Sequence, residues 1–389
     1  MADGSTEKTL LHFMMNTKEV LIGQHRSLFG TEEYILAAPG RINIIGEHTD
    51  YNQGLVLPYA LNRHIYMAWS TGEDRILVYS LDYRQFMDLS EIPVFHGWMN
   101  YFFQAKELFL RKFGEVPPLH ITIASDLPSG AGVSSSSALT CGIIFLFQHA
   151  LGLSLDREEM IRLAVEVEHG TGVRGGTMDQ TTILCAKKNY AVKLDFKKNT
   201  KTFVPVNFGD FTPWLIHSGI SHSLVHSDYN QRRRECEESV WRISSEYRPI
   251  KSLSDLNPDD LNYLNLPEML FRRTSFVVKE NERVNQAFDC LHGNNIESLG
   301  QLLYQSHEGL SKLYEVSTPE IDYFIESLKN KGEVAGARMI GGGFGGSILA
   351  LIRKGSDVLD DVVWQYNQKF NKKAFFIEAE SSQALEIIQ

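Results

Sequence analysis

Apolar and polar positions along the first half of the chain form short strand-like segments separated by helical patterns. Short apolar or alternating segments predict β-strands at residues 34–38, 65–69, 76–80 and 119–123. The dipeptide Pro39-Gly40 is a turn signal, so we expect the first strand to end there. Apolar residues at every third or fourth position predict helices over residues 10–28 and 98–113.

The longest apolar stretch, residues 138–153, is interrupted by Gln148 and His149 and is too short to cross a bilayer. It therefore predicts a buried helix. This helix should begin in a run of serines that follows a glycine-rich loop at residues 129–132.

The pattern changes near Pro213. A strand candidate at 214–218 precedes long helical stretches between residues 232 and 313, and later segments predict strands at 336–339 and 347–351 and a helix over 358–370. We therefore expect two domains, an N-terminal domain over residues 1–211 and a C-terminal domain over residues 212–389. Strands and helices do not alternate regularly enough for a doubly wound sheet, so the predicted fold class is α+β.

Composition narrows the class of protein further. The 389 residues are 43% hydrophobic, enough for a large core, and their formal net charge is −10. A negative field disfavours non-specific binding to nucleic acid or to an anionic membrane, so we expect neither as a partner. The densest basic cluster, Arg232, Arg233 and Arg234, is followed at once by three glutamates within four residues, which predicts a solvated helix face.

The cysteines and the N-terminus bear on the cellular compartment. Cys141, Cys185, Cys236 and Cys290 lie far apart, and the sequence has no Cys/His spacing typical of a zinc site. The first ten residues are polar and lack the apolar region of a signal peptide. These features favour a reduced protein located in the cytoplasm.

The first candidate for a binding site is the segment Leu127-Pro-Ser-Gly-Ala-Gly-Val-Ser-Ser-Ser-Ser-Ala-Leu139. Glycines let backbone N–H groups approach a ligand, and the unpaired N–H groups of the following helix attract phosphate. The segment is not a Walker A loop, because no Gly-Lys-Ser/Thr follows it. A plain turn with a serine cap is the alternative, but one cap satisfies a helix end and four serines exceed that need. A serine hydroxyl here could also bind Mg²⁺.

A second segment, residues 39–54, concentrates polar groups between apolar strands. Its carboxylate, imidazole, amide and guanidinium groups are Arg41, Asn43, Glu47, His48, Asp50 and Asn52. Such a set suits recognition of several neighbouring hydroxyl groups. A metal site and a polar surface loop are the alternatives. Neighbouring residues on a strand point to opposite faces, so the adjacent Glu47 and His48 would not share a metal ion there.

The segment Arg41-Ile-Asn-Ile-Ile-Gly-Glu-His-Thr-Asp-Tyr-Asn-Gln-Gly-Leu-Val-Leu-Pro58 resembles the sugar-binding segment of galactokinases. Residues 128–138 resemble the ATP-binding motif of the wider family that includes homoserine, mevalonate and phosphomevalonate kinases. Gly341-Gly-Gly-Phe-Gly-Gly-Ser347 resembles the third, C-terminal glycine motif of that family. The motifs occur in the family's order, and the resemblance extends from about residue 30 to residue 385.

This resemblance implies a two-domain small-molecule kinase fold. Its N-terminal half would resemble domain 2 of ribosomal protein S5, its C-terminal half would be ferredoxin-like, and the active site would lie in the cleft between them. The implied reaction uses MgATP to phosphorylate the C1 hydroxyl of galactose, which yields galactose 1-phosphate and ADP and begins galactose catabolism by the Leloir pathway. The implied cofactors are ATP and Mg²⁺, the small-molecule partners are galactose and ATP, and a monomer is expected. Alternatives are a 1-kinase for N-acetylgalactosamine or galacturonate, and a non-catalytic galactose/ATP sensor.

The catalytic assignment also comes from the resemblance. By itself, Asp179 in Gly175-Gly-Thr-Met-Asp-Gln180 is typical of a turn or a helix cap. In galactokinases the similar segment places an aspartate against the reacting hydroxyl. Asp179 would therefore orient, and as a base deprotonate, the C1 hydroxyl, while Arg41 would stabilise charge on the transferred phosphoryl group. A base and an electrostatic partner both remain open as the role of Asp179.

The resemblance assigns further residues by function. Sugar contacts fall on Glu47, His48, Thr49, Asp50, Gly176 and Tyr229, with a packed aromatic residue as the alternative for Tyr229. Phosphate contacts fall on Gly130, Ala131, Gly132, Val133, Ser134, Ser135 and Ser136. The Mg²⁺ contacts fall on Ser136 and Glu168, directly or through water. Adenine contacts fall on Ser80, Trp98 and Tyr101, whose aromatic rings could instead belong to the core.

One stretch departs from the galactokinase pattern. Residues 168–176 are one residue shorter than is usual, and Arg174 and Gly175 replace the common Pro-Cys pair. In the family this stretch lies near the C2 side of the sugar. The departure therefore bears on the choice between galactose and a related sugar.

Overall fold

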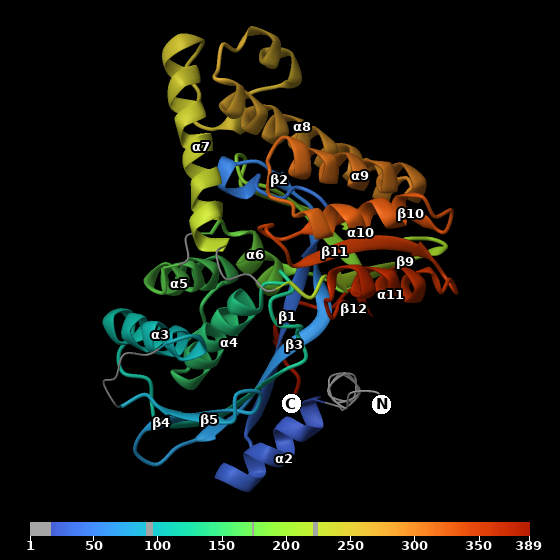
Figure 1. Ribbon diagram of the computed structural model, residues 1–389. Coiled ribbons are helices and arrows are strands. Elements are labelled where there is room, and N and C mark those ends of the chain that lie inside the picture. Colours follow the sequence, from blue (N-terminus) through green and yellow to red (C-terminus); the bar gives the residue numbers. More distant parts are fainter. Residues whose placement is uncertain (1–16, 91–95, 173–174, 221–224) are drawn as a thin grey trace.

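The computed structural model of the chain describes residues 17–90, 96–172, 175–220 and 225–389. In Figure 1 the N-terminal half forms the lower part of the molecule, and the C-terminal half forms the upper part. Strands β1 (Tyr34–Asn43) and β3 (Pro58–Thr71) run from the lower part up to the junction of the two halves. Strand β13 (Glu386–Ile387) pairs with β1, so the end of the chain returns to the N-terminal sheet.

The N-terminal sheet has six strands in the order β13-β1-β3-β6-β4-β5. Its remaining strands are β4 (Ile76–Ser80), β5 (Gln85–Asp88) and β6 (Leu119–Ser125). All neighbouring strands are antiparallel except β4 and β6, which are parallel. The four strands expected from the sequence in this half are thus confirmed, although β3 begins seven residues earlier than expected.

The expected turn at Pro39-Gly40 is wrong, because β1 continues through it with a β-bulge. A Cβ atom at Gly40 would lie 2.8 Å from the Val133 carbonyl oxygen and 2.4 Å from a Leu127 methyl group. The missing side chain lets the strand pass close to residues 127–136, the glycine-serine loop, and the Arg41 N–H donates to the Val133 carbonyl over 3.0 Å. Glycine therefore serves a close backbone approach here, which brings Arg41 to that loop.

Helices cover both faces of this sheet. The helices are α2 (Thr17–Phe29), α3 (Trp98–Lys112), α4 (Ser135–Ala150), α5 (Arg157–Gly170) and α6 (Met178–Cys185). Side chains alternate along the strands, so Leu36 packs in the main core with α4, whereas its neighbour Ile35 packs with Leu21 of α2. The expected helices over 98–113 and 138–153 are confirmed. Of the helix expected over residues 10–28, residues 17–28 are helical and residues 10–16 lie outside the described residues.

The C-terminal half contains an antiparallel four-stranded sheet in the order β10-β11-β9-β12. Its strands are β9 (Phe211–His217), β10 (Val334–Ile340), β11 (Ser347–Arg353) and β12 (Phe375–Glu378). Its helices are α7 (Val225–Glu246), α8 (Glu268–His292), α9 (Ile296–Lys312), α10 (Pro319–Lys329) and α11 (Val358–Phe370). Short 3₁₀ turns, η2 (Leu253–Asp255) and η3 (Pro258–Tyr263), interrupt the helical stretch between α7 and α8.

A small sheet and a 3₁₀ turn join the halves near the polar segment at residues 39–54. One is a three-stranded sheet of β2 (Leu55–Val56), β7 (Tyr190–Asp195) and β8 (Thr200–Pro205), and the other is the 3₁₀ turn η1 (Asp50–Asn52). The fold is α+β, as expected. The division at residues 211/212 stays a prediction, since the main core includes residues of both halves.

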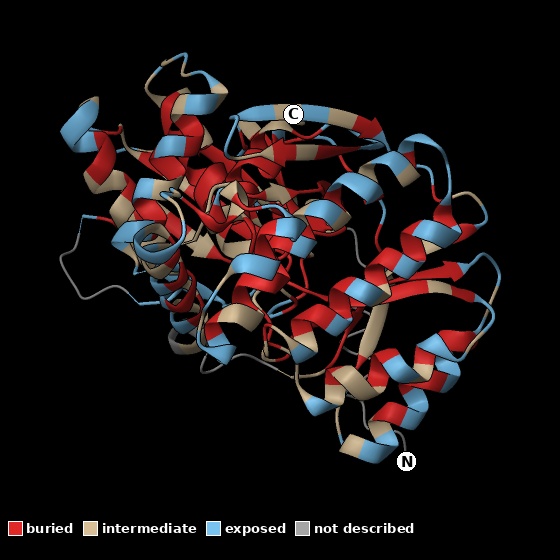
Figure 2. Ribbon diagram, turned by 90° about the horizontal axis from the view of Figure 1, so that it is seen from above, coloured by how far each residue is buried: buried red, intermediate tan, exposed pale blue. Residues whose placement is uncertain are grey.

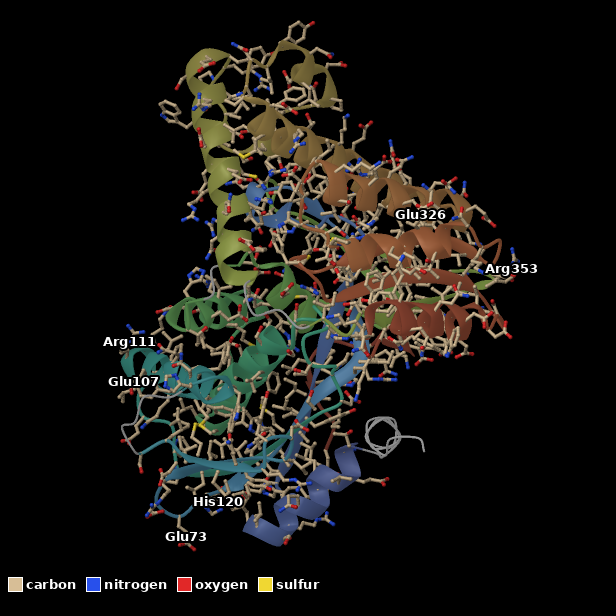
Figure 3. All side chains as sticks on the ribbon, viewed as in Figure 1. Glu73, Glu107, Arg111, His120, Glu326 and Arg353 are labelled. Carbon is tan, nitrogen blue, oxygen red and sulfur yellow. The ribbon has the colours of Figure 1, made fainter. Side chains whose placement is uncertain are left out.

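Figure 2 shows the buried residues on the inward faces of the helices and the exposed ones outside. Figure 3 shows the same pattern for charged side chains: Glu107 and Arg111 project outward from α3, and Arg353 lies at the rim of the C-terminal sheet. Among the described residues, no helix is both long and apolar enough to cross a membrane.

The expected solvated face at residues 232–234 is wrong for Arg232. This side chain is 10% exposed, donates to the Tyr314 and Glu315 carbonyls, and pairs with Glu235 at 3.2 Å. Arg233 fits the expectation better, since it pairs with Glu237 one turn along the helix in a partly exposed position. The charge pattern alone did not reveal the carbonyls that Arg232 reaches across the fold.

Candidate active site

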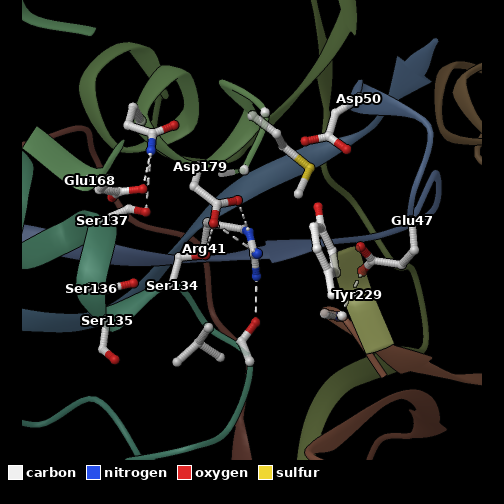
Figure 4. A pocket seen from close by; sticks show the side chains of 18 of the residues that line it. Arg41, Glu47, Asp50, Ser134, Ser135, Ser136, Ser137, Glu168, Asp179 and Tyr229 are labelled. Carbon is white, nitrogen blue, oxygen red and sulfur yellow. Dashed lines mark hydrogen bonds and ion pairs between the residues drawn. The ribbon is translucent and has the colours of Figure 1, made fainter. Parts of the chain in front are cut away.

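A cavity of about 300 Å³ lies where the two halves meet (Figure 4). Its walls come from the loop after β1, the glycine-serine loop, the turn before α6, the start of α7, and the loop between β10 and β11. The expected residues that line it are Arg41, Glu47, His48, Asp50, Gly130, Gly132, Val133, Ser134, Ser135, Ser136, Glu168, Gly176, Asp179 and Tyr229. Segments more than 300 residues apart in sequence therefore contribute to one pocket.

Arg41 and Asp179 face each other at the centre of the cavity (Figure 4). The guanidinium donates from Nε to Asp179 Oδ1 over 2.7 Å and from Nη2 to Oδ2 over 3.2 Å, and from Nη1 to the Gly132 carbonyl. Ser134 donates its hydroxyl hydrogen to Asp179 Oδ2. The arginine side chain is 7% exposed and that of Asp179 is 26% exposed. A bidentate pair of this kind fixes both side chains in orientation as well as in position.

The local backbone explains this convergence. Asp179 lies in the first turn of α6, and Arg41 lies near the end of β1. Ser134 has a φ of 61°, a left-handed conformation uncommon for a residue with a side chain. Burial alone would lower the pKa of Arg41, but the carboxylates of Asp179, Glu47 and Asp50 outweigh that effect and raise the pKa above its ordinary value. Arg41 therefore stays charged in the pocket.

Glu47 is held by the C-terminal half of the chain. Its Oε1 accepts from Arg338 Nη2 over 2.7 Å and from the Gly341 N–H over 2.9 Å. Arg338 is fully buried and also donates to the Ile44 carbonyl over 3.1 Å. Both bonds end on Oε1, which leaves Oε2 of Glu47 for a ligand in the cavity.

His48 lies in a turn and has a φ of 61°, so it is not on a strand beside Glu47 as the sequence suggested. Its Nδ1 is 2.8 Å from the Tyr51 hydroxyl, and the backbone of Gly342 also lies against the ring. The Tyr229 ring packs against His48 with ring centroids 5.4 Å apart. No group of three or more His, Cys, Asp or Glu side chains with metal-binding geometry occurs in the described residues.

Asp50 lines the cavity without an ion pair among the described salt bridges. Burial, with the charges of Asp179 and Glu47, raises its pKa to about 6. Gly176 lies directly against it, since a Cβ atom there would be 2.0 Å from Asp50 Oδ2. Thr49 does not join this set: its hydroxyl contacts the Gly46 and Leu55 carbonyls and is fully buried.

A second cavity of about 830 Å³ adjoins the first, and both are lined by Ser135 and Ser136. Ser80, Trp98 and Tyr101, the residues expected at an adenine site, all line it. The Tyr83 ring lies nearly parallel to that of Trp98, with centroids 6.2 Å apart and 11° between the planes. Such flat aromatic surfaces suit stacking on a planar base.

Glu168 offers oxygen ligands at the wall of the first cavity. Its Oε2 accepts from Gln180 Nε2 over 2.8 Å, whereas its Oε1 and the Gln180 Oε1 are buried without a hydrogen-bond partner among the described residues. Burial raises the pKa of Glu168 to about 7, and the nearby Asp179 charge adds to this shift. Ser136 also lines the cavity. Unpaired carboxylate and amide oxygens beside a hydroxyl fit a hard divalent cation such as Mg²⁺.

Some lining residues were not expected from the sequence. They are Ser137, Gly172, Gly175, Met178, Gln180, Asn230, Gly341 and Gly342. Two signals could have found several of them: the third glycine motif contains Gly341 and Gly342, and Gln180 directly follows Asp179. Ala131, which was expected, is buried and is not among the lining residues, and Arg174 lies outside the described residues.

Sequence profiles of known families match most of the cavity's segments. Residues 23–71 match the galactokinase galactose-binding signature, residues 100–187 the GHMP kinases N-terminal domain, and residues 287–363 the GHMP kinases C-terminal domain. The galactokinase of Thermotoga maritima is 37% identical over 354 residues, which cover 90% of this chain and 99% of that protein. The galactokinase of Limosilactobacillus reuteri is 32% identical over 385 residues, which cover 93% of this chain and 97% of that protein.

Solved structures agree with this result. The galactokinase of Lactococcus lactis, solved with galactose, matches with a TM-score of 0.89 and 28% identity over 95% of this chain and 99% of that chain. The mevalonate kinase of Methanococcus jannaschii matches with a TM-score of 0.65 at 17% identity, covering 91% of this chain and 100% of that chain. The second match shows a shared fold.

Proposed function

The chain belongs to the galactokinase family of GHMP kinases, and on that premise we propose that it transfers the γ-phosphoryl group of ATP to the C1 hydroxyl of galactose. The products are galactose 1-phosphate and ADP. Galactose would occupy the 300 Å³ cavity, and the nucleotide would occupy the 830 Å³ cavity beside it. The observation that carries this assignment is the Arg41–Asp179 pair, which lies next to the serines shared by both cavities.

In this proposal Asp179 aims the reacting hydroxyl. A carboxylate has about four lone-pair sites, and Arg41 and Ser134 use three of them. The remaining site can accept the hydrogen of the C1 hydroxyl and direct its oxygen towards the γ-phosphorus. A loose phosphoryl-transfer transition state needs little early proton removal, so orientation is the main task of Asp179. Arg41 stabilises the charge that develops on the transferred group.

The nucleotide would be held by stacking and by backbone groups. Trp98 and Tyr101 provide aromatic surface for the base, and Ser80 lies beside them. Residues 130–136 lead into the N-terminus of α4, where unpaired N–H groups and the helix dipole attract phosphate. Gly130 and Gly132 both line the sugar cavity, and their φ values of 69° are a left-handed conformation that glycine adopts without steric cost.

Glu168 and Ser136 are the residues that would hold Mg²⁺, directly or through water. Glu168 Oε1 is a buried oxygen that still lacks a partner, and Ser136 opens onto both cavities. The bound ion would neutralise phosphate charge during transfer. Glu47, His48, Asp50, Gly176 and Tyr229 surround the remaining space and supply the hydrogen-bonding groups that a hexose requires.

The same proposal places the protein in the cytoplasm as a monomer. Its four cysteines are all unpaired, which suits a reducing compartment.

A coupled assay of ADP release with a panel of sugars tests the proposal. Galactose should support ATP consumption, whereas glucose and arabinose should support little. Turnover with N-acetylgalactosamine or galacturonate but not with galactose would reassign the substrate. Binding of galactose and ATP without turnover would reassign the protein as a sensor.

A further inference from the structure

Part of the polar segment forms a closed loop whose two ends lie side by side. We call residues 46–55 the sugar loop. Three of its residues line the 300 Å³ cavity, namely Glu47, His48 and Asp50. Just outside the loop the chain pairs with itself: the Ile44 N–H donates to the Leu57 carbonyl, and the Leu57 N–H donates to the Ile45 carbonyl, each over 3.1 Å. The chain therefore enters and leaves the sugar loop at one place.

Thr49 closes the loop from within. Its hydroxyl oxygen lies 2.9 Å from the Gly46 carbonyl oxygen and 2.6 Å from the Leu55 carbonyl oxygen. Its own carbonyl accepts from the Gly54 N–H over 2.8 Å, and Thr49 is fully buried. These contacts occupy the carbonyl groups at the two ends of the loop and leave the N–H groups there to other partners.

Helix α8 supplies those partners from two neighbouring residues. The Gly46 N–H donates to Glu280 Oε1 over 3.0 Å. The Leu55 N–H donates to Asn281 Oδ1 over 2.8 Å. One helix of the C-terminal half therefore accepts a hydrogen bond from each end of the sugar loop.

Both acceptors are themselves held in place. Glu280 is fully buried, and it accepts from the Ser306 hydroxyl at Oε1 over 2.6 Å and from Arg283 Nε at Oε2 over 2.7 Å. Asn281 donates from Nδ2 to the Ser254 hydroxyl oxygen over 2.9 Å. A backbone N–H can only donate, so the Asn281 atom that faces the loop is the amide oxygen, and the contact with Ser254 keeps it there.

Two glycines let the loop lie this close to the helix. A Cβ atom at Gly54 would be 2.4 Å from Asn281 Oδ1, and one at Gly46 would be 2.9 Å from a Val284 methyl group of α8. Gly46 also has a φ of 102°, which favours glycine. The sequence of the loop is therefore fitted to α8 at both ends.

We propose that Glu280 and Asn281 are positioning residues for galactose binding, because they hold the two ends of the sugar loop and so keep its cavity-lining side chains in the binding arrangement. Neither is among the described residues that line the cavity, so both act on the sugar only through the loop. Without one anchor the loop would sample other conformations. The affinity for galactose would then fall in proportion to the fraction of molecules that keep the binding arrangement. This inference rests on the proposed function.

Amide hydrogen exchange, followed by mass spectrometry of peptides that cover residues 46–55, tests the anchoring without any sugar. Asn281→Ala removes the acceptor of the Leu55 N–H and should make exchange in the loop roughly tenfold faster, because a buried donor loses its partner. Asn281→Asp keeps an oxygen towards Leu55, and the Ser254 hydroxyl can donate to its second oxygen. Asn281→Asp should therefore restore most of the slow exchange.

The Glu280 end is tested in the same way. Glu280→Asp keeps a carboxylate as the partner of Arg283, but its shorter side chain withdraws the oxygen from the Gly46 N–H. Exchange in the sugar loop should again become faster. Wild-type exchange in either Asn281→Ala or Glu280→Asp would overturn the proposal for that residue.

Kinetics test the consequence for the sugar. Asn281→Ala and Glu280→Asp should each raise KM for galactose roughly five- to twentyfold, while kcat and KM for ATP stay close to the wild-type values. The described residues that line the 830 Å³ cavity include none from the sugar loop, and Arg41 and Asp179 lie outside that loop. A purely structural role would instead lower kcat through loss of folded enzyme and leave KM for galactose unchanged. That result, or faster loop exchange with an unchanged KM for galactose, would overturn the proposal.

Two other asparagines provide matched controls. Asn285 lies one turn further along α8 and accepts from Lys193, which is outside the loop, so Asn285→Ala should change neither loop exchange nor KM for galactose. Asn295 caps α9 by accepting from the Ser298 N–H, so Asn295→Ala should destabilise the fold and still leave KM for galactose unchanged. An equal rise of KM in either control would contradict the proposal. If the protein proves not to use galactose, the kinetic arm fails, whereas loop exchange still decides whether α8 anchors the loop.

Discussion

Replacing Asp50 with asparagine tests whether the ionised Asp50 carboxylate in the sugar cavity lowers the free energy of unfolding. Burial and the charges of Asp179 and Glu47 raise the pKa of Asp50 to about 6, against 3.8 for a free aspartate. Each pH unit between two such pKa values corresponds to about 1.4 kcal/mol, so ionised Asp50 disfavours the folded state by up to about 3 kcal/mol. The carboxyl is partly exposed to the cavity, which makes this figure an upper limit.

The direction in which the free energy of unfolding changes with pH follows from proton binding. Between about pH 4 and pH 6 the folded state binds more protons at Asp50 than the unfolded state does, so this group lowers the free energy of unfolding as pH rises through that window. Asp50→Asn should therefore raise the free energy of unfolding by about 1–3 kcal/mol near pH 8 and by roughly half as much near pH 5. Urea denaturation of the wild type and the variant at both pH values measures the difference.

Asp260 offers a control of opposite sign. Hydrogen bonds from the Asn257 N–H and from Arg248 lower the pKa of Asp260, and this residue lies outside both cavities. Asp260→Asn should thus lower the free energy of unfolding near pH 8 and have less effect in acid. The reasoning fails if Asp50→Asn does not raise the free energy of unfolding near pH 8, or raises it by the same amount at both pH values. Either result would mean that the folded protein does not disfavour the ionised carboxylate.

Three further substitutions test the proposed roles in the cavity. Asp179→Asn should cut turnover by roughly 10²–10⁴-fold while ATP binding, measured by calorimetry, persists; near-normal turnover would remove Asp179 from its role. Ser136→Ala should raise the Mg²⁺ concentration needed for half-maximal activity, and an unchanged metal titration would place that ligand elsewhere. Gly176→Ala should push the Asp50 carboxylate aside and raise KM for galactose, because its Cβ atom would lie 2.0 Å from Oδ2. Gly332→Ala would place its Cβ atom in open space outside both cavities and should leave KM unchanged; equal effects of both would contradict the steric argument.

Local sequence signals predicted much of the fold and of the cavity. The periodicity predicted α11 at its observed bounds and β4 at its observed bounds, since both have strong patterns and clear ends. The glycine-serine loop and the polar segment drew attention because several unusual residues stand together in each. They supply most of the residues that line the cavity.

Residues that act alone across long sequence distances were not predictable in this way. Arg338 pairs with Glu47 across 291 positions and is a single arginine in an apolar strand. Tyr314 likewise carries no local pattern that indicates its contacts with Tyr51 and with Cys236. Periodicity reports which face of an element is buried, whereas these partners depend on how distant elements meet.

Two of the wrong expectations have the same cause. Pro39-Gly40 is a turn signal in isolation, but the lack of a side chain at Gly40 also permits a strand to run against the Val133 carbonyl. Arg232 stands among glutamates that would neutralise it in solvent, but it reaches the carbonyls of Tyr314 and Glu315. The local sequence allows a turn or a continuous strand in the first case, and an exposed or a buried side chain in the second. In both cases a tertiary contact decided between them.

The balance of charge in the cavity also bears on which sugar it accepts. Asp179 is paired with Arg41, and Glu47 is paired with Arg338, so each of these carboxylates has its own cation. Asp50 has no ion pair of its own, and its pKa is raised by burial and by the negative charges around it. An anionic sugar such as galacturonate would add a further carboxylate to this space, at an energetic cost that a neutral hexose avoids. The cavity is thus matched to an uncharged sugar, and turnover of galacturonate at a rate comparable to that of galactose would contradict this account of its electrostatics.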